Sequence, residues 1–280
     1  MSAPVETAFD TARVGVAVES EPIAITAEQT RRFAEATNDP GADYLEGRLA
    51  PPLYALVPVL KTMVAAKNAV TRAFAFHGEH DLVIHRPLEP GMTVRVTATV
   101  IGVRQRSAGV ATIVRVETRA EDMLLNEQHF TSFVAGGRVT GEAGEDAPPH
   151  VPEPASGPVL EATMPLDPDQ TRRFAAAADD WDAYTLDEEV ARAMGFPTII
   201  VHGTCTMAFA ARAIVDEMCA GDSRRLERFA ARLARPLLLV SGQALTTRMW
   251  AAGQGRVIGF EAVDYGGTPM IKNGWAEVSA

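Results

Sequence analysis

Residues 180–207 read DWDAYTLDEEVARAMGFPTIIVHGTCTM, an acidic loop followed by a Gly-Phe-Pro turn and the start of an apolar run. The run continues to Cys219, and apolar side chains lie on nearly all sides of a helix drawn through Thr198–Cys219. A helix that is apolar all round is buried in a protein core. This stretch therefore predicts an acidic loop that leads into a buried helix.

Two cysteines occur in the chain, Cys205 and Cys219, and both fall in this predicted helix. Fourteen residues separate them, a distance of about 21 Å along a helix. That separation is too large for a disulfide bond. We expect both side chains to be reduced and to lie in the core.

Moving outward from this stretch, the chain contains an internal repeat. The repeated segments are QTRRFA (29–34 and 170–175), the acidic turns NDP and DDW that follow it (38–40 and 179–181), and RPL (86–88 and 235–237). Several repeated segments in the same order indicate a repeated architecture. Between the copies, GEAGEDAPPHVPEPASGP (141–158) has the composition of an extended linker. We therefore predict an N-terminal domain over 1–140, a linker over 141–158 and a C-terminal domain over 159–280.

Each half shows the same order of elements. A short amphipathic helix (Thr26–Ala36 or Asp167–Ala178) precedes the acidic loop, a long apolar helix and then strands. In Met92–Val103 apolar and polar residues alternate, as in a half-buried strand. The other predicted strands are Val110–Arg119, Leu125–Val134, Ala244–Trp250, Arg256–Val263 and Met270–Val278. One buried helix with several antiparallel strands is an α+β architecture.

Composition limits the kind of protein and its partners. Hydrophobic residues make up 47% and charged residues 22% of the 280 residues, as in globular proteins. The formal net charge of −10 argues against a nucleic acid partner. We find no secretory signal and no apolar run long enough for a bilayer, so we expect no membrane partner and a cytoplasmic location.

Motif searches exclude several common enzyme classes. The chain has no Gly-x-Ser-x-Gly elbow, no Walker loop and no dinucleotide fingerprint. The run HGEHDLVIH (77–85) contains three histidines but no known metal-ligand spacing. We therefore expect no metal and no cofactor. The densest basic stretch, SRRLERFAARLAR (223–235), either contacts a phosphorylated ligand or is a solvated strand face; both interpretations stay open.

The stretch from Asp180 to Met207 resembles the motif of MaoC-like (R)-specific enoyl-CoA hydratases. That motif reads Asp-x-Asn-Pro-(Ile/Leu)-His, an Asp-Glu-x-x-Ala stretch, Gly-Phe and then His-Gly. The resemblance covers nearly the whole chain and implies an α+β double hot-dog fold, with two antiparallel sheets each wrapped around a long central helix. It implies that the first half is a degenerate hot dog that supports the sheet and completes an acyl tunnel.

The resemblance also implies an activity and a site. Its members are lyases that hydrate an enoyl thioester or dehydrate a 3-hydroxyacyl thioester, carried by CoA or an acyl carrier protein, in fatty acid or polyketide metabolism. The family's Asp falls on Asp180 and its helix-start Gly, the oxyanion donor, on Gly203. The family's His falls on Thr185, which cannot exchange a proton near neutral pH. Thr185 could only orient a water, and it would assist Asp180 together with Tyr184 or His202.

The first half does not offer the same site. Asp39 aligns with Asp180 and Tyr44 with Thr185, so the histidine is missing there too. Pro52 aligns with Gly203, and proline has no N–H to donate. We therefore expect one site in each chain.

Two other functions stay open at this point. The chain could be a thioesterase or another specialised thioester enzyme, because a carboxylate facing an oxyanion donor is sufficient for attack by water. Alternatively, it could be a non-catalytic hot-dog subunit that binds an acyl thioester, since the family's histidine is absent. A homodimer would fit the resemblance, because hot-dog sheets often pair further.

Overall fold

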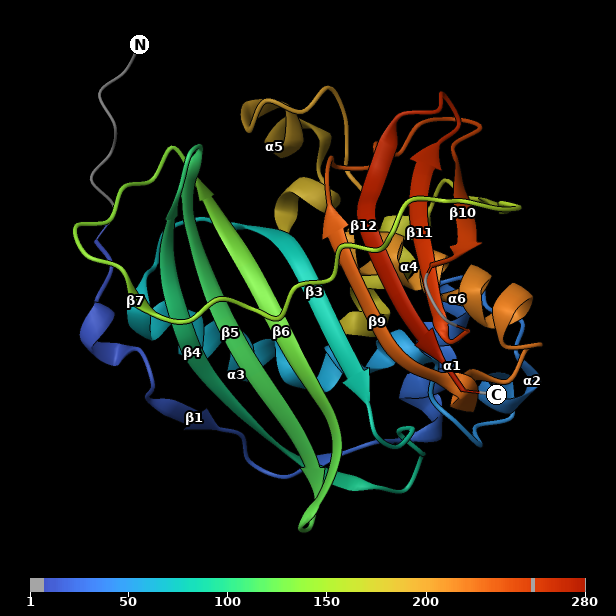
Figure 1. Cartoon of the computed structure of the whole chain (residues 1–280), viewed down its shortest axis with the longest axis horizontal. Coiled ribbons are helices and arrows are strands. Elements are labelled where there is room, and N and C mark those ends of the chain that lie inside the picture. The colour runs from blue at the N-terminus through green and yellow to red at the C-terminus, as the bar shows by residue number, and fades with distance from the viewer. Residues whose placement is uncertain (1–7, 253–254, 280) are drawn as a thin grey trace. The chain divides into compact units, whose positions relative to one another are not determined.

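The computed structural model of the chain describes residues 8–252 and 255–279 (Figure 1). These residues form two compact units. The first unit contains residues 8–24, Pro58–Arg86 and Thr93–Pro149, and the second contains Ile25–Val57, Pro87–Met92 and the described part of 150–280. The second unit thus includes residues from both halves of the repeat. The domain division at 141–158 stays a prediction.

The first unit is an antiparallel sheet with one long helix. Its strand order is β1-β4-β5-β6-β3, and β2 and β7 also pair with β4. The strands are β1 (Ala17–Glu19), β2 (Ile23–Ala24), β3 (Phe76–Ile84), β4 (Thr93–Arg106), β5 (Gly109–Ala120), β6 (Met123–Ala135) and β7 (Ala143–Gly144). The 3-10 helix η1 covers Thr11–Arg13, and α3 (Leu56–Val70) lies behind the sheet in Figure 1.

Alternation along β4 explains which face of this sheet is buried. Val94, Val96 and Ala98 are fully buried, whereas the neighbouring Thr93 and Arg95 are exposed. The predicted half-buried strand is therefore confirmed, and the predicted strands at β5 and β6 are confirmed within a few residues. Strand β3 was not predicted, because its buried residues include polar His80 and Asp81.

The second unit repeats the plan of an antiparallel sheet with a long helix. Its strand order is β9-β12-β11-β10-β8. The strands are β8 (Leu160–Pro165), β9 (Leu226–Leu233), β10 (Ala244–Ala251), β11 (Val257–Asp264) and β12 (Pro269–Val278). The helices are α1 (Ala27–Ala36), α2 (Ala42–Leu45), α4 (Gln170–Ala178), α5 (Glu188–Ala193), α6 (Gly203–Met218), and the 3-10 turns η2 (Pro52–Ala55), η3 (Ala183–Thr185) and η4 (Ser223–Arg225). The predicted α+β class is confirmed in each unit.

Helix α6 is the buried helix that the sequence predicts, but it begins later than expected. Met207, Phe209 and Ile214 in its interior are at most 1% exposed. Residues 199–201 are extended instead, because the N–H of Val201 donates to Leu237 O (2.8 Å) and Ile199 O accepts from Leu239 N–H (2.9 Å). The two cysteines are buried free thiols, as predicted.

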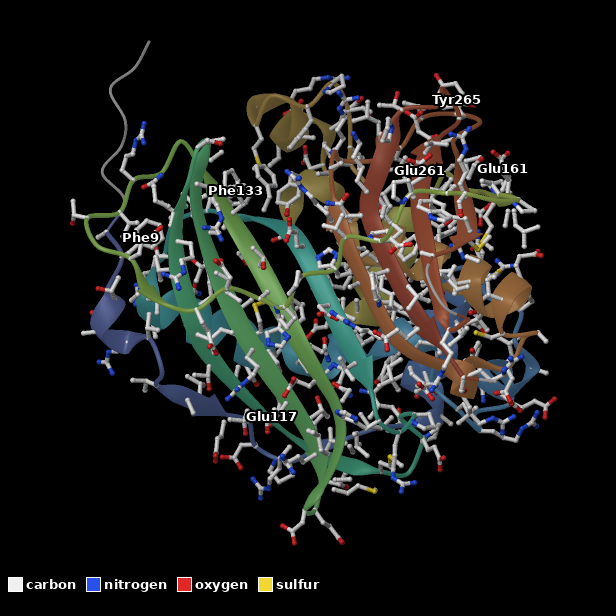
Figure 2. All side chains as sticks on the ribbon, in the orientation of Figure 1. Phe9, Glu117, Phe133, Glu161, Glu261 and Tyr265 are labelled. Carbon is white, nitrogen blue, oxygen red and sulfur yellow. The ribbon has the colours of Figure 1, made fainter. Side chains whose placement is uncertain are left out.

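The outer face of the second sheet carries charged pairs. Arg248 on β10 lies opposite Glu161 on β8 and Glu261 on β11, with N–O distances of 2.8 and 3.4 Å. Figure 2 labels both carboxylates on this face. Cross-strand pairs of opposite charge are typical of a sheet surface that faces water.

The repeat seen in the sequence is a repeat in backbone structure. Asn38 and Asp179 both adopt a left-handed conformation, with φ of 55° and 52°, and end α1 and α4. The next residue in each case returns its N–H to the helix: Asp39 to Ala34 O (2.8 Å) and Asp180 to Ala175 O (3.2 Å). A left-handed residue at a helix end is favoured for Asn and Asp.

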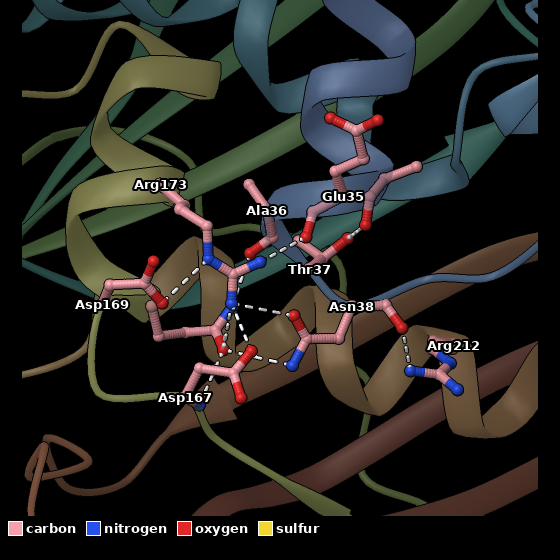
Figure 3. Close-up of polar contacts among 10 residues, drawn as sticks. Glu35, Ala36, Thr37, Asn38, Asp167, Asp169, Arg173 and Arg212 are labelled. Atoms are coloured by element: carbon pink, nitrogen blue, oxygen red, sulfur yellow. Dashed lines mark hydrogen bonds and ion pairs between the residues drawn. The ribbon is translucent and has the colours of Figure 1, made fainter.

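Helices α1 and α4 pack on each other inside the second unit. The rings of Phe33 and Phe174 lie 5.6 Å apart, and each residue is 1% exposed. Arg173 and Gln170 donate to the carbonyls of Glu35 and Ala36 at the end of α1 (Figure 3). These donors satisfy carbonyls that have no partner within the helix.

One helical run, Pro52–Val70, is long and apolar enough to cross a membrane by length and composition. This differs from the expectation that no such run exists. The most apolar window of that run is 56% buried within the protein, as in a core helix. Because buried core helices meet the same criterion, the run does not establish a membrane span. This applies to the part of the chain that the structure describes.

Candidate active site

Asp180 is held at the point where the chain reverses after α4. The left-handed Asp179 turns the backbone, and the side chain of Asp180 becomes half-buried. Burial raises the pKa of Asp180 to about 6, and the negative charges of Asp182 and Asp179 add to the rise. A backbone hydrogen bond from Asp182 opposes it. A carboxyl group with this pKa can both accept and donate a proton near neutral pH.

Thr185 lies in the turn η3 and is 1% exposed. Its hydroxyl donates to the carbonyl oxygen of Asp182 at 2.7 Å. The hydroxyl oxygen of Thr185 also lies 3.0 Å from Nε2 of His202, and that nitrogen lies 3.1 Å from the carbonyl oxygen of Asp180. Thr185, His202 and the backbone of Asp180 are therefore joined by hydrogen bonds.

His202 and Gly203 mark the start of α6. His202 is the N-cap and is 4% exposed, and its carbonyl accepts from the N–H of Thr206 (3.0 Å). Burial lowers the pKa of His202, partly offset by its bond to the backbone of Asp180 and by the charge of Asp182. Gly203 is the first residue of the helix. The N–H groups at this end have no partner within the helix and form the positive end of the helix dipole.

Gly203 lies close to a side chain of the sheet. A Cβ built there would lie 2.6 Å from Cδ1 of Leu233 on β9. The helix start therefore approaches the sheet closely and presents its backbone rather than a side chain. A backbone N–H in this position can donate a hydrogen bond to an oxyanion that develops during a reaction.

Tyr184 points to a neighbouring carboxylate. Its hydroxyl donates to Oδ2 of Asp182 at 2.7 Å, and its ring lies 6.4 Å from that of Phe196. Burial raises the pKa of Tyr184 well above its usual value of 10.0, so the phenol stays protonated. Tyr184 is linked to the site through Asp182.

The structure thus brings together the five residues expected from the sequence: Asp180, Gly203, Thr185, Tyr184 and His202. Their catalytic roles stay predictions. Sequence reasoning missed the bond between Thr185 and His202 and the placement of Asp182 beside both Asp180 and Tyr184. No spacing rule could reveal the first contact, because 17 residues separate the partners and the fold brings them together.

The counterpart of this loop in the first half has a different environment. Asp39 is 9% exposed and accepts from the N–H of Gly41 at 3.0 Å. Burial raises the pKa of Asp39 to about 6, against the opposing effects of that bond and of Arg212. Tyr44, at the position equivalent to Thr185, is 4% exposed. Pro52 begins η2, where the second half has the N-terminus of α6.

The histidine run and the basic stretch do not form obvious ligand sites. The rings of His77 and His80 lie 5.3 Å apart, but among residues 8–252 and 255–279 no three His, Cys, Asp or Glu side chains are grouped as metal ligands. The expected absence of a metal stays a prediction. In the basic stretch, Arg224 pairs with Asp222 and Arg228 with Glu277, so these charges have partners within the chain.

Two family models match separate stretches of the chain. A family model described as MaoC like domain matches residues 150–266. A model described as FAS1-like, dehydratase domain region matches residues 12–123.

Curated relatives carry related names. The 3-hydroxyacyl-thioester dehydratase Y of Mycobacterium tuberculosis is 28% identical over 214 residues, which cover 74% of this chain and 72% of that protein. Other matched relatives are named enoyl-CoA hydratases. The matches cover from 28% to 72% of the length of these curated relatives.

Solved structures share the fold over nearly the whole chain. A MaoC-like dehydratase from Phytophthora capsici superposes with a TM-score of 0.87 at 23% identity, covering 96% of this chain and 98% of that one. A conserved hypothetical protein from Mycobacterium tuberculosis, described as having a double hot-dog fold, superposes with a TM-score of 0.63 at 15% identity, with 97% of each chain covered. The predicted double hot-dog fold is confirmed.

Proposed function

Because the chain belongs to the family of double hot-dog proteins with a MaoC-like dehydratase domain, we propose that it hydrates an enoyl thioester or dehydrates a 3-hydroxyacyl thioester. The observation that carries this proposal is a carboxyl group with a pKa near 6, Asp180, in the same hydrogen-bonded cluster as the N-terminus of α6. The names of the matched relatives support the same reaction in both directions.

In the hydration direction, the carboxylate of Asp180 accepts a proton from water as the water oxygen bonds to C3 of the enoyl group. The electron pair of the C2–C3 double bond then moves to the thioester oxygen, which becomes an enolate. Asp180, now protonated, delivers a proton to C2 and returns to the carboxylate. Dehydration is the reverse sequence. A pKa near 6 suits a group that performs both transfers.

The N–H of Gly203 stabilises the enolate. The positive end of α6, a helix of 16 residues, adds to that stabilisation. Leu233 packs against Gly203, which supports a fixed position for the donor. Removing one such donor from an enzyme typically lowers kcat by about 10²–10³-fold.

The test is turnover of crotonyl-CoA, followed by loss of the enoyl-thioester absorbance. The wild type should be active, and Asp180→Asn should lose activity. Asp39→Asn is the matched control, because Asp39 occupies the equivalent place in the first repeat, where Pro52 stands at the position of Gly203 and has no N–H to donate. Turnover that persists in Asp180→Asn would refute the mechanism. Thr185→His, which restores the family's residue, should keep or raise activity.

The substitution at position 185 motivates two alternatives. If the site hydrolyses the thioester, free CoA thiol will appear from a saturated acyl-CoA, and hydration will not be seen. If the chain only binds an acyl thioester, it will bind acyl-CoA without turnover, or will purify with a related subunit that carries the histidine. Both alternatives share the fold and the oxyanion donor with the leading proposal.

The remaining assignments are proposals as well. An acyl-CoA or acyl-carrier-protein thioester is the expected partner, and neither nucleic acid nor a membrane is expected. A homodimer and a cytoplasmic location stay predictions.

A further inference from the structure

The position at which the family motif has a histidine is occupied here by a buried hydroxyl whose single proton is already donated within the chain. Thr185 has one proton, and the hydrogen bond of 2.7 Å to Asp182 O uses it, because a carbonyl oxygen can only accept. The same hydroxyl oxygen lies 3.0 Å from Nε2 of His202 and must accept there. At 1% exposure, the side chain has both its donor and an acceptor in use.

These directions fix the protonation of His202. Since the Thr185 hydroxyl has given its proton away, Nε2 must carry the hydrogen that joins them. The second neighbour of Nε2, the carbonyl oxygen of Asp180 at 3.1 Å, also requires a donor. Both contacts therefore require a proton on Nε2. Nδ1 is a buried nitrogen with no hydrogen-bond partner among the described residues, so a second proton would have no acceptor there, and burial lowers the pKa of His202. The imidazole is therefore neutral and protonated on Nε2.

We propose that His202 and Thr185 are positioning residues, which tie the backbone of Asp180 to the N-terminus of α6, and that no imidazole transfers a proton in the reaction. This inference rests on the proposed function. His202 precedes the oxyanion donor Gly203 directly, and its Nε2–H binds the residue that carries the acid/base group. The bond thus fixes the two halves of the site relative to each other.

The repeat provides independent support. In the first half, the loop that contains Asp39 is also anchored on α6, because Arg212 donates to the carbonyl oxygen of Asn38. Asn38 and Asp39 align with Asp179 and Asp180. The N-cap residue His202 and Arg212 within α6 therefore each bind a backbone carbonyl of one acidic loop (Figure 3 shows the Arg212 contact). In the first half that anchor is a guanidinium, which has no proton-transfer role near neutral pH.

The discriminating variant is His202→Gln. The amide nitrogen of glutamine lies as many bonds from Cβ as Nε2 of histidine, so it can donate to Asp180 O and Thr185 without a titratable ring. We expect His202→Gln to keep kcat for crotonyl-CoA hydration within about tenfold of the wild type. Loss of a group that transfers protons costs about 10²–10⁴-fold. A kcat for His202→Gln as low as that of Asp180→Asn would overturn the proposal.

Position 185 provides a matched pair of variants. Thr185→Ser keeps the hydroxyl and should retain activity, whereas Thr185→Val keeps the shape and removes the bond to His202. We expect Thr185→Val to lower kcat by about 10–100-fold with little change in KM, because a reacting group misplaced by about 1 Å can cost about 10²-fold. Equal kcat for the Ser and Val variants would contradict the role of the hydroxyl.

A spectroscopic readout separates this inference from the proposed function. In the intact chain labelled with ¹⁵N-histidine, six imidazoles are observed, and the His202 signals are those missing in His202→Gln. We expect the chemical shifts of a protonated Nε2 and an unprotonated Nδ1. A protonated Nδ1 would overturn the inference even in an active enzyme. An inactive wild type with the expected shifts would refute the hydratase proposal but leave the positioning contact established.

Discussion

Replacing Asp182 by asparagine should lower the pKa of Asp180 and move the acid limb of the pH–rate profile to lower pH. Asp182 raises that pKa through its negative charge, second only to burial. Asparagine has the same shape, keeps the backbone N–H that binds Asp180, and offers an oxygen to the hydroxyl of Tyr184. The variant therefore removes one charge and leaves the other contacts of the loop in place.

The expected size of the shift in the pKa of Asp180 follows from the exposure of Asp182. Asp182 is exposed, and interactions between exposed charges amount to about 0.2–1 kcal/mol, or about 0.1–0.7 pKa units. The total rise, from 3.8 to about 6, is larger, so most of it should remain in the variant. Asp179→Asn, which removes the third-ranked contribution, should give a smaller shift.

The assay is kcat/KM for crotonyl-CoA hydration between about pH 4.5 and 8, which reports ionisation in the free enzyme. Hydration needs the carboxylate form of Asp180, so the rate should fall as the pH drops through about 6 in the wild type. The midpoint should be lower in Asp182→Asn. A midpoint that is unchanged or higher in the variant, or near 4 in the wild type, would refute this account of the Asp180 environment.

Three further variants test the packing and charge of the second unit. Gly203→Ala should lower kcat and reduce the free energy of unfolding by about 1–3 kcal/mol, because the new Cβ displaces Leu233. Steady-state kinetics would measure the first effect and urea unfolding the second. Asp39 has a folded pKa near 6, above its ordinary 3.8, so its stabilising contribution is present below about pH 4 and lost as pH rises through 6. Asp39→Asn should therefore raise the free energy of unfolding at pH 7–8 by up to about 3 kcal/mol, and should not raise it near pH 4. A difference in urea midpoint between the variant and the wild type that is the same at both pH values would contradict this. Phe174→Ala removes a ring that packs on Phe33 and should cost about 3–5 kcal/mol in urea unfolding, whereas a loss below about 1 kcal/mol would argue against the α1–α4 contact.

Much of the fold could be predicted because local patterns determine it. Alternation in β4 and the apolar run of α6 identify a buried sheet face and a buried helix. The repeat at 29–34 and 170–175 identifies α1 and α4, each followed by a left-handed residue. Strand β9 was harder to recognise, because it lacks regular alternation: Arg228 and Arg232 flank the three consecutive buried residues 229–231.

The chemistry of the site was less accessible to sequence reasoning, because it depends on contacts between distant residues. A threonine in place of a histidine looks like a simple loss until His202 is found 3.0 Å from it. The elevated pKa of Asp39 was also unexpected, since the burial that raises it depends on the folded chain and not on the local sequence. Alignment alone places Asp39 and Asp180 at equivalent positions and gives no information about what each side chain faces.

Membership of residues 25–57 in the second unit has a practical consequence for anyone who divides or transplants this protein. A fragment that starts in the linker would contain every residue of the candidate site, yet would leave the ring of Phe174 and the donors of Gln170 and Arg173 without α1. Such a fragment would expose an apolar surface and aggregate rather than display its chemistry. Any minimal functional version of the protein must therefore include this early segment, however far it lies from the site along the chain.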